Sequence, residues 1–173
     1  FTRGKICCYD IIILTGNTTR GVIFLTKQEY QHIRNLAWDL LIDANITSLP
    51  VSLHAIAALY GMQSLIDTSK SRYENACILS YRILKIFGYK NEPEYVRYLA
   101  IRILAPMIVL REVNVSSAKE VADLTELPIQ IASQRYRRYC MLLDRNAFGA
   151  SQVEVKVLSQ FRDWIITFRK TPR

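Results

Sequence analysis

One signal recurs along this chain and constrains its fold more than any other. A Ser or Thr is followed three residues later by Glu at Thr26/Glu29, Ser71/Glu74, Ser117/Glu120 and Ser151/Glu154. This spacing is typical of a capping box, in which the hydroxyl and the carboxylate satisfy free backbone N–H groups at the start of a helix. Four such starts spread over 173 residues predict a mainly helical fold.

The apolar periodicity after Thr26 sets the expected extent of each helix. We expect helices at about 26–44, 49–60, 71–87, 91–104, 117–124, 128–144 and 151–168. Gly61 and Gly88 follow two of these segments, as residues that end helices commonly do. Pro106 is expected to kink or end the fourth helix, because its ring clashes with the preceding turn and it has no N–H to donate.

The first 25 residues follow a different pattern. Two β-rich stretches, 6–14 and 21–25, flank a polar segment, which predicts a β-hairpin over about 5–25. A hairpin alone is marginally stable in water, so it must pack on something. We therefore predict an α+β fold, mainly α, with 1–25 as a hairpin extension and 26–173 as one helical domain.

Composition narrows the class of protein further. Half of the residues are hydrophobic and 22% are charged, which is typical of a globular chain rather than a disordered one. The net charge of +8 permits an acidic partner such as nucleic acid without requiring one. No apolar run reaches the ~18–20 residues that span a bilayer, so we expect no membrane partner. Four cysteines without metal-type spacing favour a reducing, cytoplasmic location. The oligomeric state is left open.

Several segments resemble the ImmA/IrrE-type metallopeptidase family. The similar stretches are 26–61, Ile103-Leu104-Ala105-Pro106 with Val109-Leu110-Arg111-Glu112, Ser117–Asp123, and the tail from Arg145 to Phe161. The resemblance spans about residues 26–168. It implies a compact, zincin-like helical domain of a bacterial zinc peptidase with a small β-sheet. Known members cleave repressors of mobile elements or act in stress-response regulation.

The family's chemistry needs residues that this chain lacks. Two His at i and i+4 bind zinc, the Glu between them activates water, and a Glu on a later helix is the third ligand. The Arg72-Tyr73…Ala76 stretch resembles the family's lead-in to this motif. The five motif positions then fall on Cys77, Ile78, Leu79, Ser80 and Tyr81, and the third ligand falls on Tyr95.

Only Cys77 among these replacements is able to bind zinc, and Ile78 occupies the position of the base. The chain has two histidines, His32 and His54, in different expected helices, so no His-Glu-x-x-His exists. We therefore expect a lost zinc site, no cofactor, and a pseudo-metallopeptidase. The alternative is a residual zinc peptidase with a rearranged site built from Cys77, His54 and Glu94.

A length difference points the same way. The family places several strands before the motif helix, but here only residues 62–70 separate that helix from the preceding one. The resemblance then implies a reduced sheet that lacks a wall of the substrate cleft. We hypothesise that the 5–25 hairpin replaces this sheet beside the 71–87 helix.

Two functions follow for a chain without catalysis. The first is a regulatory or protein-binding module, which binds the repressor-like partner that an active relative cleaves. The alternative is a DNA-binding regulator, because 116–140 has the spacing of a helix-turn-helix. Its second helix carries side chains able to read base edges: Gln130, Gln134, Arg135, Arg137 and Arg138. The other interpretation of this helical pair is that it is an ordinary part of the fold and its Arg side chains are merely solvated.

Three tyrosines stand near the positions of the family's metal pocket. Tyr81, Tyr95 and Tyr98 are bulky enough to fill a vacated cavity, which would otherwise destabilise the core. Alternatively, they line an aromatic pocket for a peptide or a small ligand.

Overall fold

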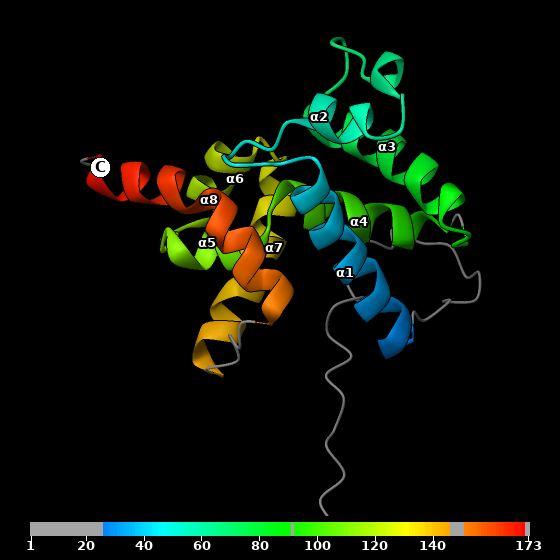
Figure 1. Ribbon diagram of the computed structural model, residues 1–173. Coiled ribbons are helices and arrows are strands. Elements are labelled where there is room, and N and C mark those ends of the chain that lie inside the picture. The colour runs from blue at the N-terminus through cyan, green and yellow to red at the C-terminus, as the bar shows by residue number, and fades with distance from the viewer. Residues whose placement is uncertain (1–25, 91, 146–150, 172–173) are drawn as a thin grey trace, which may run out of the picture.

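The computed structural model describes residues 26–90, 92–145 and 151–171 (Figure 1). Its elements are α1 (Lys27–Asp43), α2 (Leu53–Ala58), the short 3-10 helix η2 (Gln63–Leu65), α3 (Arg72–Ile86), α4 (Pro93–Leu104), α5 (Met107–Glu112), α6 (Ala118–Thr125), α7 (Ile129–Asp144) and α8 (Gln152–Lys170).

The expected α+β class is wrong. The described residues contain helices and no strand, so the reduced sheet of a zincin-like domain is not formed by them. The predicted hairpin at 5–25, and its packing beside the 71–87 helix, lie outside the described residues. Residues 62–70, which are too few for the strands that the family has before its motif helix, form η2 and a loop.

The four predicted helix starts are confirmed. Complete capping boxes form at Thr26, Ser71 and Ser151. At Ser117 the hydroxyl accepts from the N–H of Glu120, while the carboxylate of Glu120 accepts from the N–H of Ser116 at 2.7 Å. These contacts satisfy N–H groups that the first turn of a helix leaves without an intrahelical acceptor.

Two predicted helix ends are also confirmed. Gly61 and Gly88 have φ angles of +66° and +72°, where a residue with a Cβ atom is strained. The chain breaks at Ala105 and Pro106, and a new helix, α5, starts at Met107.

Helix α4 lies at the centre of the core. It packs against α1 on one side and α3 on another, and α1 also packs against α8 (Figure 1). Leu99, Ile103 and Leu104 of α4 are fully buried, and so are Leu41 of α1 and Phe161 of α8. Each such side chain stabilises the fold by about 1.5–3 kcal/mol relative to its exposed state.

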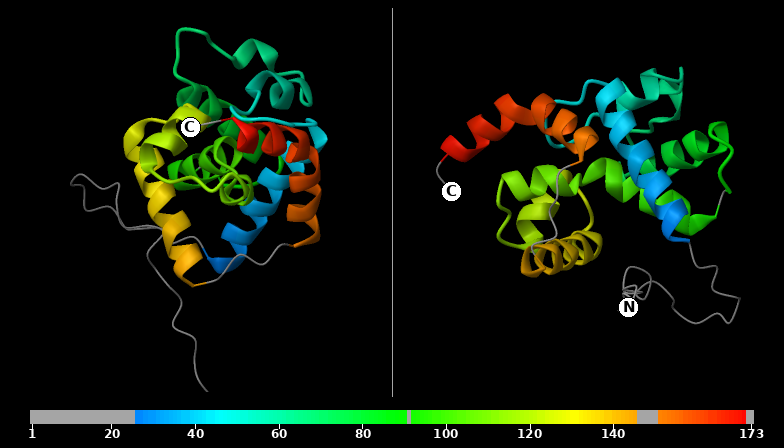
Figure 2. Two further views of the ribbon diagram at one scale, coloured as in Figure 1. Left: turned by 90° about the vertical axis from the view of Figure 1, so that its left-hand side faces the viewer. Right: turned by 60° about the horizontal axis from the view of Figure 1, so that its bottom comes forward.

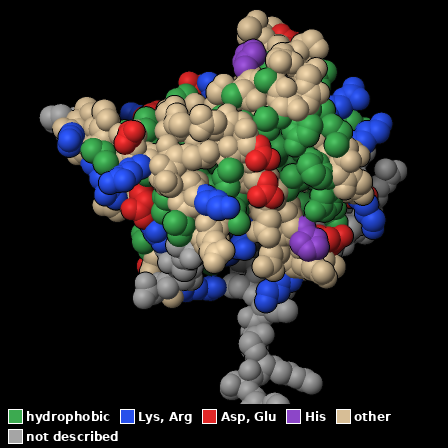
Figure 3. All heavy atoms as spheres, in the orientation of Figure 1, with side chains coloured by type: hydrophobic (Ala, Val, Ile, Leu, Met, Phe, Trp, Pro, Cys, Tyr) green, Lys and Arg blue, Asp and Glu red, His purple; other side chains and the backbone are tan. Residues whose placement is uncertain are grey.

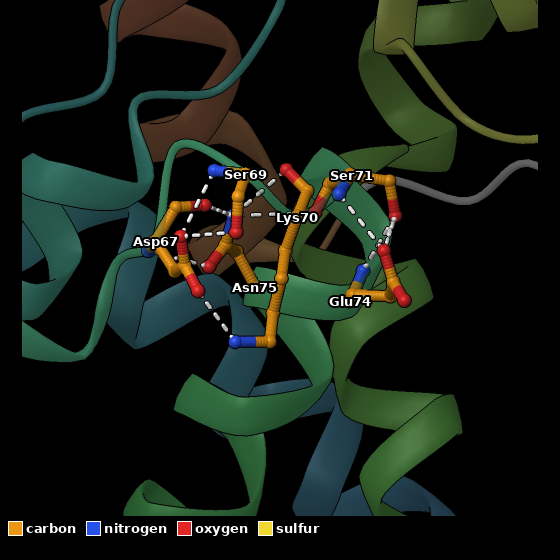
Figure 4. A network of polar contacts seen from close by, with 6 residues as sticks. All are labelled: Asp67, Ser69, Lys70, Ser71, Glu74 and Asn75. Carbon is orange, nitrogen blue, oxygen red and sulfur yellow. Dashed lines mark hydrogen bonds and ion pairs between the residues drawn. The ribbon is translucent and has the colours of Figure 1, made fainter.

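The loop before α3 is fixed by one buried amide, Asn75 (Figure 4). The side-chain oxygen of Asn75 accepts from the N–H of Asp67 at 2.9 Å, and its amide nitrogen donates to the carbonyls of Asp67, Lys70 and Ser71. The carboxylate of Asp67 in turn accepts from Ser69 and from Lys70. This network gives the short 66–71 segment a defined conformation without strand pairing.

Candidate nucleic-acid interface

The five positions that the resemblance aligns with a zinc motif lie on α3. Leu79 and Ser80 are fully buried, Cys77 and Ile78 are half-buried, and Tyr81 is 40% exposed. Burial raises the pKa of the Cys77 thiol. A thiol with a raised pKa is a weaker metal ligand and nucleophile, because both roles need the thiolate.

Tyr95 points to α1 rather than to α3. It is buried, and its hydroxyl donates to the Oε1 atom of Glu29 at 2.7 Å. Hydrogen bonds from the Thr26 N–H, from Tyr95 and from the Thr26 hydroxyl lower the pKa of Glu29 to about 2. Burial and the neighbouring Glu29 raise the pKa of Tyr95 to about 12. The residue at the third-ligand position is thus part of the contact between α1 and α4.

The three tyrosines near the expected metal pocket have different surroundings. Tyr98 packs edge-on against Tyr30 of α1, with ring centroids 4.8 Å apart, and Arg102 lies 4.5 Å from the centre of the Tyr98 ring. Tyr95 also contacts α1, so both fill space between α1 and α4. Tyr81 fills no core cavity, because it is exposed on α3.

The alternative metal site is not assembled. Within the described residues, no group of three or more His, Cys, Asp or Glu side chains is arranged to hold a metal ion. His54 on α2 and Glu94 on α4 are both exposed, whereas Cys77 is half-buried on α3. The structure therefore does not bring Cys77, His54 and Glu94 together.

The predicted helix-turn-helix is formed by α6 and α7, which pack directly on each other. Helix α6 ends at Thr125, and Glu126 adopts a left-handed conformation with a φ of +54°. Leu127 is buried under the turn, and α7 starts at Ile129. A short helix, a tight turn and a longer second helix are the parts of a DNA-binding helix-turn-helix. In the left view of Figure 2, α7 lies along one edge of the molecule.

The outward face of α7 carries amide and guanidinium groups. Its inward face is marked by the buried Ala132 and Tyr139. Successive residues on a helix are rotated by ~100°, so Gln130, Gln134 and Arg137 share the opposite face. Gln130 and Arg137 are exposed. Residues 129–143 contain no acidic side chain.

Arg135 does not belong to this outward face. It is only 6% exposed, and its Nε and Nη2 atoms donate to the carbonyl of Ala105 at 2.9 and 2.5 Å. That carbonyl lies at the break between α4 and α5, where the N–H of Val109 donates to Pro106 instead. Arg135 therefore holds α7 against the core and is not available to a base edge.

Two tyrosines add to the anchoring of α7. The hydroxyl of Tyr136 donates to the carbonyl of Ser116 at 2.6 Å, and that of Tyr139 lies 3.5 Å from the Oδ1 atom of Asn114. Sequence reasoning did not single out these contacts. The spacing of Ala132, Arg135 and Tyr139 is the signal that would have placed Arg135 on the buried face.

Basic and acidic side chains are nearly equal in number in the helix-turn-helix unit, residues 116–140. Residues 116–140 contain four basic residues and three acidic ones, and one of the basic residues is the buried Arg135. Glu126 pairs with Arg72 of α3 at 2.6 Å. Positive charge is therefore concentrated on α7, at Arg137 and Arg138, rather than spread over the unit.

Comparison with protein-family models, with curated proteins and with solved structures found no match to this chain. The resemblance to ImmA/IrrE-type proteins thus stays a prediction from the quoted motifs. A separate search for membrane spans found that none of the helices in the described residues combines the length and the apolar character needed to cross a bilayer.

Proposed function

We propose that this chain is a non-catalytic regulatory protein that binds duplex DNA through α6 and α7. The observation that carries the proposal is the outward face of α7, where Gln130, Gln134 and Arg137 follow one another without an intervening acid. The tight turn at Glu126 sets where α7 begins, and the bond from Arg135 to the Ala105 carbonyl fixes the opposite side of α7 to the core.

The dimensions and the chemistry of this face suit a major groove. The groove is ~12 Å wide and admits an α-helix, and glutamine pairs with adenine while arginine pairs with guanine. Gln130 and Gln134 are ~6 Å apart along the helix axis, at 1.5 Å per residue. In this arrangement the two amides and Arg137 contact successive base pairs.

The balanced charge shapes the expected binding. The helices α6 and α7 carry few Lys and Arg side chains, so their binding to DNA releases few counterions. Each phosphate contact adds only about −0.9 to the slope of log K against log salt. Lys119 and Arg145 are exposed at the two ends of the unit and are candidates for phosphate contacts. In this proposal the affinity depends more on contacts with the bases than on electrostatic attraction between the protein and the DNA phosphates.

The non-catalytic part of the proposal rests on the motif positions of α3. A peptidase of the resembled type needs a base where this chain has Ile78, and Ile78 has no group that takes a proton. We expect the purified protein and its Cys77→Ser variant to hold the same amount of zinc after incubation with zinc and removal of the excess. Stoichiometric zinc that disappears with this substitution would contradict the proposal.

The DNA-binding part is tested in two steps. Selection from a random duplex pool identifies a preferred sequence, and fluorescence anisotropy then measures its affinity. Arg137→Ala is expected to weaken binding by about 1–3 kcal/mol, which is roughly 5- to 160-fold, with an unchanged melting temperature. Arg162→Ala on α8, which also removes an exposed guanidinium, serves as the matched control. The proposal is contradicted if no sequence is enriched, or if Arg137→Ala and Arg162→Ala lose DNA affinity equally.

A further inference from the structure

Large apolar side chains are exposed together at the ends of α2 and α3. Leu59 is 41% exposed, Ile86 is 55% exposed and Phe87 is 49% exposed. The ring of Tyr60 packs edge-on against Phe87, with centroids 6.3 Å apart, and joins the two ends. We call Leu59, Tyr60, Ile86 and Phe87 the apolar stripe. Clustered exposed side chains of this size are typical of contact surfaces, whereas single ones need no explanation.

The two ends of the apolar stripe carry opposite charges. At the Tyr60 end lie Asp39 and Asp43 of α1, which help to raise the pKa of Tyr60 beyond the effect of its burial. At the Ile86 end lies Arg82, one helical turn earlier on α3, followed by Lys85. Figure 3 shows hydrophobic side chains gathered over this side of the molecule, with acidic side chains on one border and basic ones on the other.

The acidic end holds two acids, Asp39 and Asp43, and one cation, Lys156 of α8, whose charge partly offsets the effect of Asp43 on Asp39. Neither Asp39 nor Asp43 forms an ion pair with a basic side chain within the part of the chain that the structure describes. Partial burial and the neighbouring Asp43 both raise the pKa of Asp39, which shows two acids held close together. A basic group placed opposite them would relieve this repulsion.

We propose that the apolar stripe is a two-fold contact between two copies of this chain. A two-fold axis pairs each end of a surface with the opposite end of its copy. The acidic end of one copy then faces Arg82 and Lys85 of the other, and the apolar centres cover each other. A partner of uniform charge would complement one end and repel the other.

This contact is independent of the proposed DNA binding, because no stripe residue lies on α6 or α7. The stripe is smaller than the ~20–30 residues per side of a standard interface, so we expect a dissociation constant on the order of micromolar. A dimer would carry two copies of α7, which suits a site with two half-sites.

Sedimentation velocity of the full chain over a wide range of concentration tests the contact. We expect reversible dimers, and we expect Phe87→Ser and Ile86→Ser each to raise the dissociation constant at least tenfold. Val155→Ser replaces an equally exposed apolar side chain on α8 and should leave it unchanged. Thermal melting of each variant, with a midpoint near that of the parent chain, shows that it is folded.

Charge reversal identifies the occupant as a second copy. Asp43→Lys and Arg82→Glu should each weaken the dimer, and the double variant should restore it, because the reversed ends again attract across the two-fold axis. A monomer at all concentrations overturns the proposal. So does a dimer that is insensitive to these variants, or a monomer that binds a different protein, such as a repressor, through the same stripe.

Discussion

At the scale of single residues, the loop before α3 depends on Asn75. Its amide is 5% exposed and bonds four backbone groups of the 67–71 segment. Asn75→Ala removes the side-chain partner of the Asp67 N–H and of the Lys70 carbonyl, while the carbonyls of Asp67 and Ser71 keep their backbone bonds. We expect it to lower the free energy of unfolding by roughly 2–4 kcal/mol. Urea denaturation measures the change. The exposed Gln63→Ala should change it by less than about 0.5 kcal/mol, and equal effects would show that the amide does not hold the loop.

The contact between Glu29 and Tyr95 makes stability depend on pH. Glu29 has a folded pKa of about 2, below its usual value of ~4.3. Its contribution is therefore complete above the usual value and is lost as the pH falls towards 2. We expect the gap in stability between the parent chain and Glu29→Gln to close between about pH 5 and pH 2. Denaturant midpoints at a series of pH values measure it, and a gap that stays constant contradicts the assignment.

Tyr95 gives the corresponding effect on the alkaline side. Its folded pKa of about 12 exceeds the usual ~10, so the neutral form is favoured in the folded state. That contribution is complete below about pH 10 and is lost as the pH rises through 12. Tyr95→Phe keeps the ring but removes the hydroxyl that ionises. We therefore expect this variant to lose less folding stability than the parent chain as the pH rises from about 10 to 12.

At the scale of elements, the helix starts were predictable and the bonding partner of Arg135 on α7 was not. A capping box is a local pattern of four residues, so Thr26, Ser71 and Ser151 reveal it directly. The burial of Arg135 depends instead on a carbonyl at Ala105, thirty residues away, that the break at Pro106 leaves free. The spacing of Ala132, Arg135 and Tyr139 places Arg135 on the buried face, but no local pattern shows the carbonyl that it bonds.

The error about the sheet has a different origin. It came from the family resemblance rather than from any alternating pattern in residues 62–70. The structure closes this segment with side-chain bonds to Asn75, which satisfy backbone groups as a strand would. A single buried asparagine is difficult to recognise in a sequence, because asparagine is usually exposed.

Arg135 gives the element-scale prediction. Arg135→Ala leaves the Ala105 carbonyl buried and unpaired and removes a charged hydrogen bond, so we expect a loss of about 3 kcal/mol in the free energy of unfolding. Arg137→Ala, two residues further on the outward face, should change it by less than about 0.5 kcal/mol. Chemical denaturation separates the two. Similar losses would contradict the opposite placement of these side chains.

At the scale of the whole molecule, two surfaces lie on different elements of one core. The apolar stripe belongs to the ends of α2 and α3, and the polar face belongs to α7 (Figures 1 and 2). Arg72 bonds the carbonyl of Val51 and pairs with Glu126 in the turn before α7, so it links the two regions. Because the two surfaces share no residue, substitutions in one should leave the other intact, and each role is separable by experiment.

The outward face of α7 is the central claim, and amide-resolved NMR during titration with the selected duplex tests it most directly. We predict that the largest shift changes fall at Gln130, Ser133, Gln134 and Arg137, with little change on α8. Changes that spare α7 and gather on another helix, or no change at a stoichiometric amount of duplex, would contradict it.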